Sequence, residues 1–164
     1  MSYHFVLGTL CVYPFIYGIF WRKKGLRAVL YSLFYFYACA VFYLTMLPFP
    51  QQWGREFFDG DLGNFIPFRD LKMGYGGALK DILLNILMTV PFGILFPQIR
   101  NNKVISTVLI GFFASCLIEG AQLMMTLYGS PYHAFDVTDV ISNTAGCLLG
   151  YLCYITATLK DPKR

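Results

Sequence analysis

The chain has little charge. Of its 164 residues, only 13% are Asp, Glu, Lys or Arg, whereas soluble domains carry about 25%. Uncharged residues form long apolar runs at 2–21, 28–54, 82–99 and 140–159, and at 104–118 and 120–135 on either side of Glu119. This pattern excludes an ordinary soluble domain and indicates a protein that is largely embedded in lipid.

Each apolar run is long enough to cross a bilayer, which needs roughly 20 mostly apolar residues. The runs predict five membrane-spanning helices, at about 3–20, 28–47, 79–97, 104–127 and 138–159. The predicted fold class is therefore all-α, a polytopic membrane helical bundle that forms a single membrane domain over 1–164. The 48–78 segment is rich in glycine, proline and aromatic residues, and it is predicted to be an external or re-entrant loop.

Several chemical motifs are also absent. The five cysteines lie inside apolar runs without CxxC spacing, which argues against a cysteine-based metal or redox centre. The chain has no glycine-rich phosphate loop and no G-x-S-x-G nucleophile elbow. The formal net charge of +4 is explained by the placement of basic loops, so no nucleic-acid partner is expected.

Basic residues gather in loops that the five-span topology places on one side. The 21–27 loop, the 98–103 loop and the C-terminal tail hold nine of the thirteen Lys and Arg residues. Short cytoplasmic loops are enriched in these residues, so the N-terminus is predicted outside and the C-terminus in the cytoplasm. The first basic cluster follows the first span, whereas a signal peptide has basic residues before its apolar part. The first span is thus predicted to be a retained helix.

In that orientation, three spans carry polar side chains in their outer halves. These are Asp81 and Asn85 in the third span, Glu119 and Gln122 in the fourth, and Asp136, Asp139 and Asn143 at the head of the fifth. Residues three or four apart share a helix face. The seven side chains are therefore predicted to line one acidic, outward-facing cleft.

Small residues and proline predict how the spans pack below that cleft. Gly146 and Gly150 form a small-xxx-small pattern that lets helices approach closely, and Gly111 and Gly120 are expected to serve the same purpose in the fourth span. Pro91 removes a helical hydrogen bond, so it is expected to kink the third span, with Gly93 part of the same shaped point.

These polar groups also have structural explanations. Asn143 and Gln122 are suited to interhelical hydrogen bonds, and Asp136 is suited to capping the fifth helix. For Glu119 a functional role is favoured, because a carboxylate within a membrane span is costly. Oxygen ligands such as Asp136 and Asp139 could bind a divalent metal, but no spacing requires one, so no cofactor is predicted.

Four sequence pieces, in order, resemble the VanZ-like family of small bacterial membrane proteins. They are NFIPF at 64–68, DILLNILMTVPFG at 81–93, Glu119-x-x-Gln122, and FDVTDVISNTAGCLLGY at 135–151. The resemblance covers roughly 40–155 and implies a four-helix core, to which the first span is an addition. It implies a multi-pass protein of the bacterial cytoplasmic membrane.

The resemblance also implies a role at the cell envelope, since the family's named member is associated with low-level resistance to teicoplanin and related lipoglycopeptides. Implied partners are membrane lipids and a lipid-linked peptidoglycan precursor or the antibiotic itself. Arg69 would meet a phosphate if its loop folds over the cleft. Many family members have Arg where this chain has His133, which replaces a fixed positive charge with a titratable one.

Three functions are compatible with these features. In the first, the acidic cleft binds an amphiphile and limits antibiotic access or alters target display. In the second, the carboxylates of Glu119, Asp136 and Asp139 perform acid–base or metal-dependent chemistry on a lipid or cell-wall precursor head group. In the third, the chain is a structural partner of cell-wall machinery. The oligomeric state is not predicted.

Overall fold

The computed structural model describes residues 2–47, 63–100, 103–127 and 135–160. Five helices are long and apolar enough to cross a membrane: α1 (Ser2–Ile16) continued by the π-helical turn η1 (Tyr17–Trp21), then α2 (Leu26–Met46), α4 (Ala78–Arg100), α5 (Val104–Leu127) and α6 (Val137–Lys160). The predictions of an all-α membrane bundle and of five spans are confirmed.

The shorter elements belong to the connections between these helices. The strand β1 (Gly63–Asn64) and the one-turn helix α3 (Arg69–Lys72) lie between α2 and α4, and the strand β2 (Phe135–Asp136) directly precedes α6. β1 pairs with β2 in parallel, with Gly63 opposite Phe135 and Asn64 opposite Asp136. The part of the predicted 48–78 loop that precedes residue 63 is outside the described residues.

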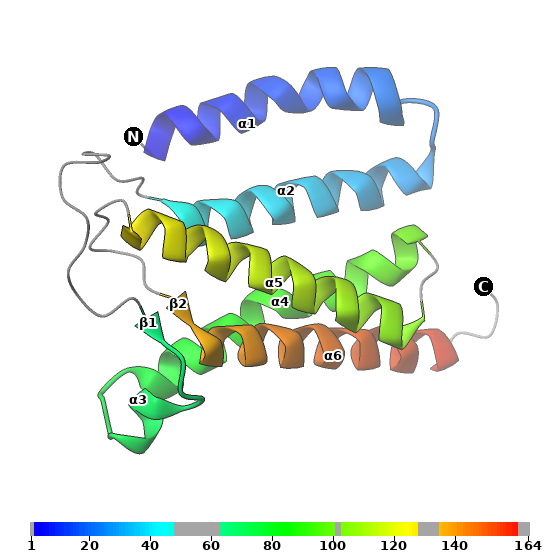
Figure 1. Ribbon diagram of the computed structural model, residues 1–164. Coiled ribbons are helices and arrows are strands. Elements are labelled where there is room, and N and C mark those ends of the chain that lie inside the picture. Colours follow the sequence, from blue (N-terminus) through cyan, green and yellow to red (C-terminus); the bar gives the residue numbers. More distant parts are fainter. Residues whose placement is uncertain (1, 48–62, 101–102, 128–134, 161–164) are drawn as a thin grey trace.

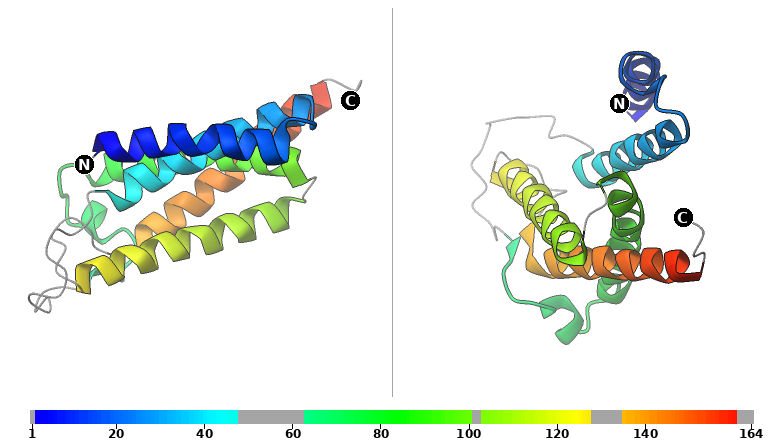
Figure 2. Two further views of the ribbon diagram at one scale, coloured as in Figure 1. Left: turned by 90° about the horizontal axis from the view of Figure 1, so that it is seen from above. Right: turned by 90° about the vertical axis from the view of Figure 1, so that its right-hand side faces the viewer.

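Helices α2, α4, α5 and α6 form a bundle, and α1 lies outside it against α2 (Figures 1 and 2). The closest pair in the bundle is α4 and α6, followed by α5 and α6. α1 and its π-helical turn have no buried residue. Their contacts with α2 are aromatic, as in the ring pair of Tyr13 and Phe36 with centroids 4.8 Å apart. The Tyr13 hydroxyl also donates to the Ser32 hydroxyl over 2.9 Å.

Glycine explains the close approach of α4 and α6. A Cβ added to Gly146 would collide with the Ile86 carbonyl oxygen, and one added to Gly150 would collide with the Val90 carbonyl oxygen. Gly93 provides the matching gap on α4, where an added Cβ would collide with the backbone of α6. Because side chains cannot fit at these points, the two backbones are in contact. α4 remains a single helix through Pro91.

The two ends of the bundle differ in composition. At one end α2 and α5 finish, α4 and α6 begin, and β1, β2 and α3 gather (Figure 1). We call it the Asp139 end, after the acidic residue in the first turn of α6. The N-terminus lies at this end and the C-terminus at the other (Figure 1). The side of the membrane that each end faces stays a prediction.

Candidate functional site

One stripe of α6 runs between α4 and α5. It consists of Asp139, Asn143 and Cys147, which are four residues apart and therefore lie on one helix face. α4 runs in the same direction as α6, and α5 runs in the opposite direction (Figure 1). Each residue of the stripe meets one residue from each neighbouring helix, which produces three layers along the bundle axis.

The first layer is acidic. The Asn85 side chain of α4 lies beside the Asp139 carboxylate. On the other side, Asp139 is close enough to Glu119 of α5 for the two carboxylates to interact electrostatically. Glu119 is only 2% exposed. The layer therefore places two acidic groups and one amide at a single level of the bundle.

The second layer contains hydroxyl and amide groups. Asn143 is 2% exposed, and its Nδ2 donates to Ser115 Oγ on α5 over 2.9 Å. Its backbone carbonyl accepts a 2.8 Å hydrogen bond from Thr89 Oγ1 of α4. The remaining polar atom of this side chain, Oδ1, has no hydrogen-bond partner among the described residues.

The third layer is close-packed. A Cβ added to Gly111 of α5 would collide with Cys147 Sγ, and one added to Gly93 of α4 would collide with the Cys147 carbonyl oxygen. Cys147 is 1% exposed. Gly120 differs, because an added Cβ would meet no described atom within 4 Å. The expectation that Gly120 provides close helix packing is therefore wrong: it does not lie on the face of α5 that meets α6.

Asp136 connects the acidic layer to the loops. Its Oδ1 accepts a 2.7 Å hydrogen bond from the Thr138 backbone N–H, which is the geometry of an N-terminal helix cap. Its Oδ2 accepts a 3.3 Å hydrogen bond from Asn64 Nδ2. The Asp136 backbone N–H donates to Glu119 Oε2 over 3.0 Å. The start of α6 is thus fixed to both β1 and α5.

A second connection holds the segment before α3 on α6. The Thr138 hydroxyl, on a residue that is 5% exposed, accepts a 3.0 Å hydrogen bond from the Phe68 backbone N–H. Phe65 stacks on Phe135 with ring centroids 4.8 Å apart. Residues from the loop predicted over 48–78 therefore pack directly on the Asp139 end.

A pocket of about 150 Å³ lies beneath α3. Four carboxylates line it, those of Asp70, Asp81, Asp136 and Asp139, together with Phe68, Leu71, Ala78, Ile82 and Thr138. Arg69 begins α3, and its neighbours Phe68 and Asp70 line this pocket, whereas Arg69 itself does not. Within the described ranges, no group of three or more His, Cys, Asp or Glu side chains is arranged to hold a metal ion.

The structure brings Asp81, Asp136 and Asp139 together in the acidic pocket, with Glu119 and Asn85 next to Asp139. Asn143 instead lines a cavity deeper in the bundle, and Arg69 is not among the described residues that line the acidic pocket.

Gln122 turns toward α2, where its Nε2 donates to the Thr45 carbonyl oxygen over 2.9 Å. It lines a different cavity, of about 490 Å³, together with Asn85 and Pro91. His133 lies outside the described residues.

Sequence reasoning missed three polar contacts of this site. Ser115 lies four residues before Glu119 and so shares its face, a spacing that would have identified it. Thr138 lies between two aspartates, which were the more obvious candidates for the site. Asn64 lies far from α6 in sequence, and only the pairing of β1 with β2 brings it to Asp136.

A family model described as VanZ/LLP1 matches residues 34–159. The chain belongs to the VanZ/LLP1 family. The match includes the four-helix bundle except the first residues of α2 and the last of α6, and α1 lies outside it. No curated protein and no solved structure matches the chain. Family membership together with five candidate spans makes this a multi-pass protein of the bacterial membrane.

Proposed function

We propose that this VanZ-family protein acts at the outer leaflet, where its acidic layer engages a lipid-linked cell-envelope component or a lipoglycopeptide. Engagement gives low-level protection against teicoplanin-like antibiotics, because it reduces antibiotic access or alters target display. In this proposal Glu119, Asp136 and Asp139 form the acidic core. Asn85 orients Asp139, and Arg69 meets a phosphate of the ligand.

The observation that carries the proposal is the position of Glu119. This carboxylate lies within a helix long enough to span the membrane and is 2% exposed. An ionisable group at such a position is expensive and is a functional candidate by default. Its Oε2 accepts a hydrogen bond from the Asp136 backbone N–H at the α6 cap, so it holds in place the residues that line the acidic pocket.

The proposal requires the Asp139 end to face outward. Support comes from the basic residues at the opposite end. Arg22, Lys23 and Lys24 lie in the turn between η1 and α2, and Arg27 lies in the first turn of α2. Short cytoplasmic loops are enriched in Lys and Arg. A ligand anchored in the outer leaflet would then reach the acidic pocket without crossing the bilayer.

The test is antibiotic susceptibility in a Gram-positive host. Wild type, Glu119→Gln and Asp139→Asn are compared at matched membrane levels against teicoplanin, with vancomycin as the second antibiotic. Thr158→Val is the control variant, because Thr158 is exposed on α6 and, among the described residues, its hydroxyl bonds within its own helix. We expect protection by wild type and Thr158→Val and none by the two acidic-layer variants. Equal protection by all four proteins would make the acidic layer structural.

A second candidate function is enzymatic, and the closeness of Glu119 and Asp139 favours it. Two carboxylates at one level can divide general acid and general base work, for hydrolysis or transfer at a lipid phosphate or glycan. Extracted lipids of cells with wild type would then differ from those of cells with Asp139→Asn. Unchanged lipids in both strains, with and without a chelator, would exclude this candidate.

A further inference from the structure

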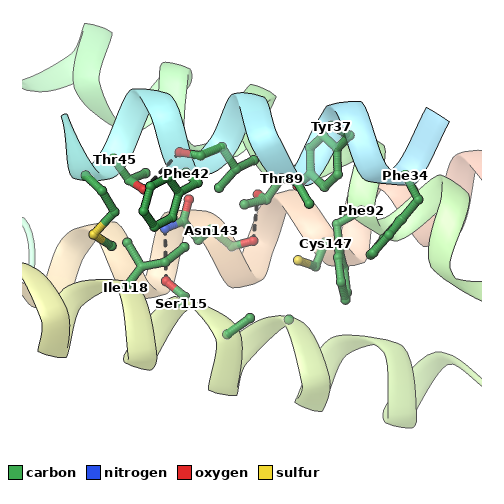
Figure 3. Close-up of a pocket in the computed structure, with 15 residues that line it drawn as sticks. Phe34, Tyr37, Phe42, Thr45, Thr89, Phe92, Ser115, Ile118, Asn143 and Cys147 are labelled. Carbon is green, nitrogen blue, oxygen red and sulfur yellow. Dashed lines mark hydrogen bonds between the residues drawn. The ribbon is translucent and has the colours of Figure 1, made fainter. Parts of the chain in front are cut away.

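A separate cavity lies deeper in the bundle than the acidic layer. Its volume is about 280 Å³, and α2, α4, α5 and α6 all contribute to its wall. Most lining side chains are hydrocarbon, including Phe34, Phe42, Phe92 and Ile118. Thr45, Thr89 and Ser115 lie near Asn143, whereas Tyr37 lies farther along the cavity (Figure 3). Ligand sites in proteins have this composition, a mostly apolar wall with few polar groups.

The hydroxyl groups of Thr45, Thr89 and Ser115, which lie near Asn143, already have partners. Thr45 Oγ1 donates to the Val41 carbonyl oxygen of its own helix. Thr89 Oγ1 bonds to the Asn143 carbonyl oxygen, and Ser115 Oγ accepts from Asn143 Nδ2. Each of these three hydroxyl oxygens therefore has at least one hydrogen-bond partner within the described residues.

Asn143 Oδ1 is the exception. It is buried, it belongs to a residue that is 2% exposed, and it has no partner within the described part of the chain. A buried amide oxygen without a donor is unfavourable, more so at membrane depth, where bulk water cannot replace the missing donor. Asn143 Oδ1 would therefore be stabilised by a hydrogen-bond donor that enters the cavity from outside the protein chain.

We propose that this cavity binds a single hydrocarbon chain joined to an N–H or O–H donor, such as a fatty amide or a long-chain alcohol. The apolar wall takes the chain, and Asn143 Oδ1 accepts the hydrogen bond from the donor. An ester of the same length is excluded from that bond because it only accepts. The site is distinct from the acidic pocket and does not depend on the proposed function.

The shape of the bundle is consistent with entry from the membrane. α2 forms one wall of the cavity, and it packs mainly on α4 and little on α5. Cys147 and Gly111 close the cavity floor on the α5–α6 side. A hydrocarbon chain that lies in the lipid can therefore enter the cavity between α2 and α5 rather than through the tightly packed α4–α6 contact.

The test is photolabelling of the full chain in phospholipid nanodiscs. Two diazirine-bearing palmitic acid derivatives are compared, the N-methyl amide and the methyl ester, and labelled residues are mapped by mass spectrometry. We expect the amide to label cavity-lining residues roughly five- to tenfold more than the ester, as one added hydrogen bond gives. Equal labelling by the two probes would overturn the proposal.

Two variants test the hydrocarbon chain and the hydrogen-bond donor of the ligand separately, and a third is a control. Ala114→Phe fills the cavity from α5 and is expected to abolish cavity labelling by both probes, whereas Ala157→Phe, at an exposed position of α6, leaves it unchanged. Asn143→Leu keeps an apolar cavity and is expected to retain ester labelling while it loses the preference for the amide. A preference that survives in Asn143→Leu would refute the role of Oδ1.

Lipids that copurify with the protein identify the source of the bound hydrocarbon chain. Enrichment of a lipid with an amide or hydroxyl donor on wild type, but not on Ala114→Phe, would assign the ligand to the host membrane. A clear amide preference without such enrichment would assign it to an amphiphile delivered from outside. Both readouts are binding measurements, so their failure is independent of antibiotic susceptibility.

Discussion

The Glu119 carboxylate accepts a 3.0 Å hydrogen bond from the backbone N–H of Asp136. The two residues belong to neighbouring elements, the last part of α5 and the strand that leads into α6. Asp136 in turn caps α6 through its side chain. One buried acid therefore sets the position of the helix start that carries the rest of the acidic layer.

Substitutions at Glu119 should separate hydrogen bonding from charge. Glu119→Gln keeps an accepting oxygen for the Asp136 N–H, whereas Glu119→Leu leaves that N–H unpaired. We expect Glu119→Leu to have a free energy of unfolding lower than that of Glu119→Gln by about 1–3 kcal/mol, the cost of a buried unsatisfied donor. Thermal unfolding in one detergent measures the difference. Equal stability of the two variants would show that this bond does not hold the cap.

The orientation of the bundle can be measured by thiol labelling. Lys72 in α3 and Lys103 before α5 are exposed residues at opposite ends. In a background with the five native cysteines replaced by serine, we expect Lys72→Cys to react with a membrane-impermeant maleimide in intact cells. Lys103→Cys should react only after the cells are permeabilised. The reverse pattern would place the acidic layer in the cytoplasm.

The glycine contact between α4 and α6 predicts a sharp difference between two Gly→Ala variants. Gly146→Ala pushes a methyl group into the Ile86 carbonyl and Thr89 Oγ1, and overpacking of this kind costs about 1–3 kcal/mol. Gly120→Ala has free space, and it should be neutral or slightly stabilising because alanine favours helix. Unfolding temperatures in matched lipid compare the two variants, and an equal decrease in both would contradict the close approach.

The loop that covers the acidic pocket depends on Thr138. Thr138→Val keeps the shape of the side chain but removes the acceptor of the Phe68 N–H. We expect faster hydrogen exchange over residues 63–72 and an intact helical bundle. Thr158→Val on the same helix is the matched control, since the Thr158 hydroxyl donates to the Tyr154 carbonyl oxygen of its own helix. Unchanged exchange in Thr138→Val would show that other contacts hold this loop.

Several features of the site could be predicted because they depend on local spacing. Asp139 and Asn143 are one helical turn apart, so their shared face follows from helix geometry alone. Glu119 is conspicuous because it interrupts an apolar run. The contacts of Gln122 and Gly120 were harder to predict. Spacing relative to Glu119 shows which residues are near Glu119, but not which neighbouring helix each residue meets. Gln122 reaches α2, and Gly120 meets no neighbouring helix closely.

The sequence by itself determined the five spans, the family and the acidic character of one end, because hydropathy, motif order and residue type need no knowledge of packing. Only the tertiary structure decided which side chains meet. The α4–α6 contact depends on three glycines from two helices that fit each other, and the pairing of Asn143 with Ser115 depends on the register of α5 against α6. Such register is fixed by interdigitating surfaces, and a single helix does not contain that information.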